Sequence, residues 1–155
     1  MASFTDNQGR SWAVDVTALS IQAIREQVDP AFLLDTAGDD NTFLRLRRDP
    51  VLLCRVVFLL CAGQRQQQGV TEADFYMQVI GDAIDRATEA LIETIEKFSP
   101  SHTRKIIKAY RAQEALERDA IGRALERLEN PELRQQMLDK LERDIDARVQ
   151  QLLEV

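Results

Sequence analysis

The chain has few of the residue types from which reactive centres are built. Its 155 residues include one histidine and two cysteines, and no CxxC pair occurs. A structural zinc site takes four cysteine or histidine ligands, so no zinc site is expected. The motifs GxxxxGK[ST] and GxGxxG are also absent, which excludes the common glycine-rich loops that cradle phosphates. The composition therefore argues against zinc and nucleotide chemistry.

The two cysteines lie in one apolar segment, seven residues apart. In a helix, Cys54 and Cys61 would share a face about two turns apart, near 10 Å, which is too far for a disulfide. We therefore expect two buried, reduced thiols in a cytoplasmic protein. The start of the chain, MASFTDNQGR, has no charged region followed by an apolar one, so no signal peptide is expected.

Long hydrophobic runs are also missing. The apolar segment at residues 51–62, VLLCRVVFLLCA, has 12 residues, whereas crossing a bilayer about 30 Å thick takes about 20. It predicts a central core helix with Arg55 at an exposed or paired edge. Asp49 and Pro50 fit the N-cap and first position of this helix. The glutamine-rich stretch at residues 64–68 predicts a solvated last turn, which Gly69 would end.

Basic charge is scarce in the first part of the chain. The net charge is −6, and residues 1–100 carry 15 acidic and 9 basic side chains, whereas residues 101–155 carry 11 of each. A nucleic-acid binder is expected to have a net basic face, because phosphate neutralisation supplies much of its affinity. Here only Arg104, Lys105, Lys108 and Arg111 cluster. We therefore expect neither a nucleic-acid partner nor, given the short apolar run, a membrane.

The N-terminal residues show the alternation of a β-hairpin. Trp12, Val14 and Val16 alternate with more polar positions, residues 6–9 supply a turn, and Phe4 falls on the first strand. A lone hairpin is marginal in water. Its Phe4 and Trp12 face must therefore either pack on helices or pair with another chain, which makes these two residues candidate partner contacts.

The rest of the sequence predicts helices with capping residues at their ends. Thr17 or Ser20 can cap one helix, and residues 71–74, TEAD, resemble a capping box that would direct Phe75, Val79 and Ile80 toward the core. Gly81 and Asp82 interrupt that helix or mark a close approach, and Ser99-Pro100-Ser101 forms the clearest internal boundary. We predict a mainly α protein, with a β-hairpin plus helical core domain at residues 1–99 and a charged helical hairpin or arm at residues 100–155.

Two charged helices are expected in the C-terminal part, separated at Asn130-Pro131. Each carries a narrow apolar stripe. The two helices either fold back on each other as an antiparallel hairpin or offer their stripes to a partner. The candidate partner contacts on these stripes are Leu116, Leu128, Leu133, Met137, Leu141, Ile145, Val149 and Leu152.

Two polar groupings invite a catalytic interpretation. His102 stands between Ser101 and Thr103, but neighbours in a helix do not face one another, and no GxSxG elbow accompanies them. The sequence favours a surface histidine. Asp82, Asp85 and Glu89, which Asp39 and Asp40 could join, suggest a carboxylate metal site of a helical enzyme. Without histidine or an ExxH helix this remains a remote hypothesis, and a solvated acidic face is favoured.

Three segments give the chain a resemblance to a known group of proteins. They are FTDNQGRSWAVDVT, DPVLLCRVVFLLCAGQ and GVTEADFYMQVIGDAIDRATEALIETIEKFSP, and the resemblance covers residues 3–99. Their order resembles that of small proteins encoded among the tail genes of long-tailed bacteriophages and prophages, the tail assembly chaperone type. The resemblance implies a non-enzymatic protein, without a cofactor, in the cytoplasm of a bacterial host. Its partners would be the tape measure protein and the tail tube protein during tail morphogenesis.

Proteins of this type leave before the virion is complete. The C-terminal residues have no counterpart in the resemblance, but their stripes suit helix-in-groove contacts with an apolar tape measure helix. An alternative is a structural virion component, a tail or connector protein that self-associates through its hairpin and C-terminal helices. The chain would then form a homo-oligomer and stay in the particle.

Overall fold

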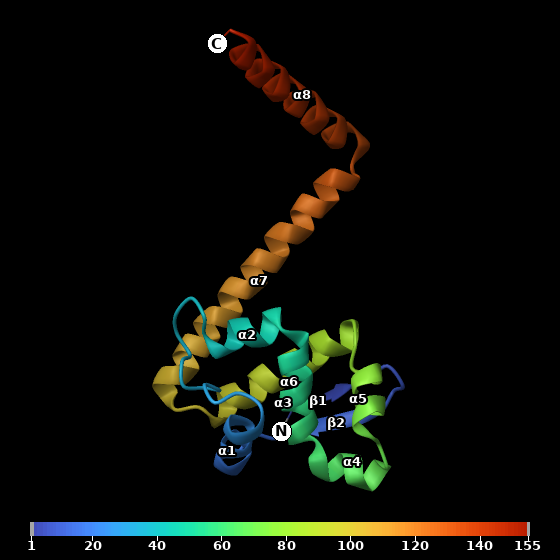
Figure 1. Ribbon diagram of the computed structural model, residues 1–155, viewed down its shortest axis with the longest axis vertical. Coiled ribbons are helices and arrows are strands. Elements are labelled where there is room, and N and C mark those ends of the chain that lie inside the picture. The colour runs from blue at the N-terminus through green and yellow to red at the C-terminus, as the bar shows by residue number, and fades with distance from the viewer. Residues whose placement is uncertain (1, 155) are drawn as a thin grey trace. The chain divides into compact units, whose positions relative to one another are not determined.

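The computed structural model describes residues 2–154 and divides the chain into two compact units, Met1–Ala109 and Tyr110–Val155. We call these the N-terminal unit and the C-terminal unit. The fold is mainly α with an N-terminal β-hairpin, as predicted (Figure 1). The elements are β1 (Ala2–Thr5), β2 (Ser11–Val14), α1 (Ala18–Gln27), α2 (Thr42–Arg48), α3 (Pro50–Leu60), α4 (Ala62–Gln68), α5 (Glu72–Gln78), α6 (Asp82–Phe98), α7 (Ser101–Glu129) and α8 (Pro131–Leu153).

A buried carboxylate organises the hairpin turn. β1 and β2 are antiparallel, with Phe4 opposite Trp12. Asp6 Oδ1 accepts hydrogen bonds from the backbone N–H groups of Gln8 (2.9 Å) and Arg10 (3.0 Å). Its Oδ2 accepts from Arg10 Nε (2.8 Å) and from the Trp12 indole (3.0 Å). Gly9 has a φ of 80°, which glycine adopts without strain. The turn therefore rests on the side chain of Asp6.

The core of the N-terminal unit lies between the hairpin and the helices. β1 packs against α6, which also packs against α3. Buried alanines on α6, among them Ala83 and Ala87, let the strand approach the helix closely. The ring of Trp12 is fully buried and meets the ring of Phe75 edge-on, with centroids 5.2 Å apart. The apolar face of the hairpin is thus covered by helices of the same unit.

Side chains from the helices also hold the hairpin by hydrogen bonds. The Gln64 amide both donates to the carbonyl of Ala13 (2.6 Å) and accepts from its N–H (2.8 Å), so it closes the outer edge of β2. Arg86 Nε donates to the carbonyl of Thr5 (3.0 Å), and Thr94 donates to that of Val14 (3.3 Å). An exposed strand edge is a template for unwanted pairing, and on β2 the Gln64 amide occupies the N–H and carbonyl of Ala13.

The helix ends follow the caps predicted from the sequence. Thr17, Asp49 and Thr71 accept hydrogen bonds from the first turns of α1, α3 and α5. Gly69 ends α4 with a φ of 64°, and Gly81 separates α5 from α6 with a φ of 57°. The apolar helix is not continuous with the glutamines, however, because α3 ends at Leu60 and α4 begins at Ala62.

The N-terminal unit continues past the predicted boundary. A helix does end at Phe98 and a new one begins at Ser101. The first turns of α7 nevertheless belong to the N-terminal unit, which extends to Ala109. Ile107 explains this, because it is fully buried. A break in helical structure at Ser99-Pro100 therefore does not coincide with the end of the compact unit.

The C-terminal unit contains the remainder of α7 and all of α8. Every described residue from Ala115 to Glu154 is exposed. Asn130 caps α8, accepting hydrogen bonds from the N–H groups of Glu132 (3.0 Å) and Leu133 (3.3 Å). Since every described residue in this range is exposed, including the apolar ones, α7 and α8 do not cover each other's stripes. The antiparallel hairpin considered above is not the observed arrangement.

Candidate interaction surfaces

Two of the predicted partner contacts lie in the core. Phe4 is 4% exposed and Trp12 is fully buried, so neither side chain is available to another protein. The prediction that they form a partner surface is therefore wrong. The sequence left two ways to cover this face of the hairpin, and α6 and α5 of the same chain cover it because the hairpin packs directly on them.

The acidic side chains considered for a metal site are not brought together. Within residues 2–154, no group of three or more histidine, cysteine, aspartate or glutamate side chains is placed to hold a metal ion. Glu89 instead accepts a hydrogen bond from Arg47 (2.6 Å) and forms an ion pair with it. Asp82 and Asp85 lie in the first turn of α6, where negative charge suits the helix dipole.

The nucleophile candidates have no activating surroundings. His102 and Ser101 are both exposed in the first turn of α7. Cys54 and Cys61 are free thiols, half-buried and buried respectively. Burial raises the pKa of Cys61 to about 12, with a smaller opposing effect of Arg65, and burial also raises the pKa of Cys54. Because the thiolate is the reactive form, both thiols stay protonated and weakly reactive at neutral pH.

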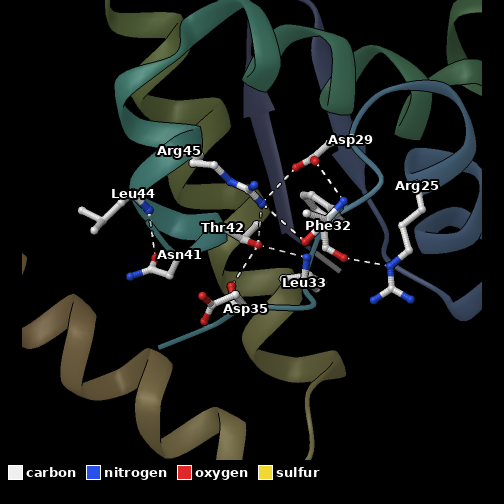
Figure 2. Close-up of polar contacts among 10 residues, drawn as sticks. Arg25, Asp29, Phe32, Leu33, Asp35, Asn41, Thr42, Leu44 and Arg45 are labelled. Carbon is white, nitrogen blue, oxygen red and sulfur yellow. Dashed lines mark hydrogen bonds and ion pairs between the residues drawn. The ribbon is translucent and has the colours of Figure 1, made fainter. Parts of the chain in front are cut away.

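A polar cluster of the N-terminal unit closes the loop between α1 and α2. Figure 2 shows its members converging on residues 29–35 from both helices. Arg45 pairs with Asp29 (3.0 Å), and Thr42 Oγ1 accepts from the N–H of Leu33 (3.0 Å) and donates to the carbonyl of Asp35 (3.2 Å). Arg25 Nε donates to the carbonyl of Phe32 (2.8 Å).

These contacts satisfy the backbone of a loop that has no regular structure. Leu33 has a φ of 57°, which is unfavourable for a leucine, and the bond from its N–H to Thr42 holds it there. Phe32, fully buried, anchors the loop in the core. The cluster has the composition of a binding site, but its polar groups are used to fold the loop.

An apolar groove is present on the N-terminal unit. Its volume is about 330 Å³, and its lining residues are Pro50, Val51, Cys54, Tyr76, Val79, Ile80 and Ile84. Ile80, predicted to face the core, is 53% exposed. The helical pattern that predicted its burial does not reach it, because α5 ends at Gln78. The groove has no charged lining residue, so it offers shape and apolar contact only.

Most of the exposed large apolar side chains are on the C-terminal unit. All of the remaining predicted contacts are exposed there, with exposed fractions from 38% for Leu133 to 77% for Leu152. On α8, five of the exposed apolar residues follow one another at spacings of three or four residues. They are Leu138, Leu141, Ile145, Val149 and Leu152, and we call them the α8 stripe. Leu138 was not among the predicted contacts, although its spacing fits them.

On α7 the apolar face differs from the predicted one. Leu116 and Leu128 are 12 residues apart, which at about 100° per residue places them about 120° apart around the helix. Ile121, Leu125 and Leu128, with Ala124, share a narrower arc, and all three large side chains are exposed. We call these four residues the α7 face. The two predicted contacts of this helix, Leu116 and Leu128, therefore do not share one narrow face.

No known protein family, curated protein or solved structure matches the chain. No helix within residues 2–154 is long and apolar enough to cross a membrane. What can be inferred about function therefore comes from the described residues. Their surfaces offer apolar contacts bordered by charges, which suit binding to another protein by burial of side chains.

Proposed function

We propose that this protein is a non-enzymatic, chaperone-like tail assembly protein of a long-tailed bacteriophage or prophage. It would act in the cytoplasm of the bacterial host, where it binds the tape measure protein, the tail tube protein or both during tail morphogenesis. The resemblance of residues 3–99 suggests the kind of function. The observation that carries the mode of action is that every described residue from 115 to 154 is exposed, including the apolar stripes of two folded helices.

An exposed amphipathic helix is suited to temporary cover of another helix. A helix whose apolar stripe is unpacked gains little stability from tertiary contacts, which normally supply most of it. Binding a partner helix buries the stripe and removes apolar area from water at roughly 25 cal/mol per Å². Because the helix is already formed before binding, it loses little further conformational entropy when the partner binds. The N-terminal unit, with its buried core, would serve as a folded base for this function.

The partner is tested by affinity capture with the full chain from a lysate of the native host that is producing tails. We expect the tape measure or tail tube protein among the captured proteins. The matched variants concern the α7 face. Ile121→Asp with Leu125→Asp should abolish capture, whereas Ala112→Asp with Ala115→Asp, which adds the same charge away from this face, should not. Equal capture by both variants would contradict the assignment of the α7 face.

Purified particles distinguish a transient role from a structural one. Mass spectrometry of complete virions should not detect the chain if it leaves during assembly. Stoichiometric amounts in the particle would instead support a structural virion component. Position in the genome provides a second test, because a chaperone gene is expected just upstream of a very long tape measure gene, linked to a second reading frame by a frameshift.

A further inference from the structure

We propose that α8 forms a parallel, two-stranded pair with α8 of a second copy of this chain. The inference deepens the proposed function by naming the partner of the α8 stripe, and it leaves the α7 face for the tail protein. It rests on the exposure, spacing and bordering charges of one helix. Within the C-terminal unit this helix is described from Pro131 to Leu153 and has no buried residue.

The α8 stripe has the geometry of a helix-pairing surface. Its members are spaced by three, four, four and three residues, so that they fall within about 80° of the helix circumference at about 100° per residue. A spacing that repeats every 11 residues averages about 3.67 residues per turn, close to the 3.6 residues of an α-helix. Such a stripe stays on one side of the helix without the left-handed supercoil that a heptad repeat imposes. The stripe therefore runs along one side of α8 over its last four turns. Two such stripes can be covered by packing along their length.

The stripe cannot be covered by α7 of the same chain without loss of structure. α7 ends at Glu129 and α8 begins at Pro131, so Asn130 alone separates them. An antiparallel helix pair needs a loop of about 2–5 residues. Asn130 is also engaged as the N-cap of α8. Folding α8 back would unwind this capped end, so cover for the stripe comes from another chain.

The charge of α8 favours a second copy as that chain. α8 carries five acidic and four basic side chains, a net charge of −1. Two copies of α8 can therefore approach each other with little net repulsion. A strongly basic or strongly acidic partner helix would gain little attraction, because α8 has almost no net charge of the opposite sign. Arg134, Glu142, Asp146 and Arg148 form no ion pair within the described residues. Their charges remain available to a partner.

The distribution of the charges selects the parallel orientation. One border of the stripe carries only acidic charges, and the other carries one arginine and one aspartate. The acidic border consists of Asp139, Glu142 and Asp146, and the other border of Arg148 and Asp144, whereas Arg134 lies in line with Leu152. In an antiparallel pair each border meets its own counterpart, which would place the three acidic residues against their copies. In a parallel pair the acidic border instead meets the border that carries Arg148 and has no net charge, which avoids this repulsion, and bordering charges set helix orientation in this way.

The pairing is tested by sedimentation of the purified full chain, with no other protein present. We expect a dimer at micromolar concentration. Leu141→Asp with Ile145→Asp should raise the dissociation constant at least about 100-fold, because each aspartate would be buried without a partner. The control, Gln136→Asp with Ala147→Asp, adds the same charge to the opposite side of α8 and should remain a dimer. Fluorescence of Trp12 checks that the N-terminal unit stays folded in both variants.

Cysteine cross-linking tests the orientation. A chain carrying Leu152→Cys should form a covalent dimer on mild oxidation, since a parallel pair places the two thiols side by side, whereas the wild-type chain should not. Cross-linking instead between a chain with Leu138→Cys and one with Leu152→Cys would show an antiparallel pair and overturn the proposal. A monomeric wild-type chain, or a dimer unaffected by the stripe variant, would also overturn it. Capture of a tail protein is a separate measurement, so the proposed function can survive the loss of this inference.

Discussion

The N-terminal unit and the C-terminal unit contain similar apolar side chains but use them in opposite ways. Val56, Leu53 and Ile24 are fully buried, whereas Leu141 and Ile145 are more than half exposed. The difference is not explained by hydrophobicity of single residues. It arises because helices of the N-terminal unit have apolar faces broad enough to surround a centre, whereas α8 has one narrow stripe bordered by charge. The first unit is therefore folded by its own contacts, whereas the second leaves its large apolar side chains exposed.

The sharpest test of this comparison deletes one large side chain from each unit. Phe75→Ala should lower the free energy of unfolding of the N-terminal unit by about 3–5 kcal/mol, because the buried ring meets Trp12 edge-on. Leu141→Ala should change it by less than about 0.5 kcal/mol, as expected for an exposed position. Trp12, the only tryptophan, reports on unfolding in urea. Equal effects of the two changes would contradict the division into a packed unit and an exposed one.

The next largest effect concerns the polar centre of the hairpin. Asp6→Ala should cost about 1.5–3 kcal/mol, the range for hydrogen bonds to a charged group, because it leaves the buried Trp12 indole without an acceptor. Asp139→Ala, which removes an exposed carboxylate from α8, is the matched change and should be nearly neutral. Both are measured by urea unfolding at neutral pH. A neutral result at Asp6 would show that the turn does not depend on its carboxylate.

Acidification should destabilise the N-terminal unit through the same residue. Burial would raise the pKa of Asp6, but the bonds from Trp12, Arg10 and Gln8 outweigh it and hold the pKa below the ordinary 3.8. Since the unfolded chain binds this proton more readily, the contribution is complete above pH 3.8 and is lost as the pH falls through the lower, folded value. Urea midpoints at descending pH should therefore fall less steeply for Asp6→Asn than for the wild type in this acidic range. If the urea midpoints of the wild type and of Asp6→Asn fell equally with pH, Asp6 would not be the cause of the destabilisation by acid.

A smaller effect is expected where a single side chain closes the sheet. Gln64→Ala should cost about 1 kcal/mol, because the amide makes two hydrogen bonds to Ala13. Gln67→Ala is the matched change, since Gln67 lies in the same helix and is exposed, and it should have almost no effect. Amide hydrogen exchange at Ala13 should rise in the first variant alone. Unchanged protection there would show that the bond does not hold the edge of β2.

The local elements of this protein could be predicted from short stretches of sequence. The hairpin turn at residues 6–9, the caps at Thr17, Asp49 and Thr71, and the breaks at Gly81 and Asn130 were all found where the pattern placed them. Each depends on a backbone conformation or a capping bond within a few residues. Such interactions are visible in sequence because both partners lie in the same short stretch.

Which segment buries each apolar face depends on contacts between residues that are far apart in the sequence. Phe4 and Trp12 are buried because α6, some 80 residues away, packs on their hairpin. In the sequence Gln64 is one of several glutamines predicted to be solvated, yet its amide forms a hydrogen bond with Ala13, which is 51 residues away in the chain. Ile80 is exposed two residues beyond the end of α5. Periodicity shows that a face is apolar, but whether it is covered, or left exposed as on α8, is decided by packing of the whole chain.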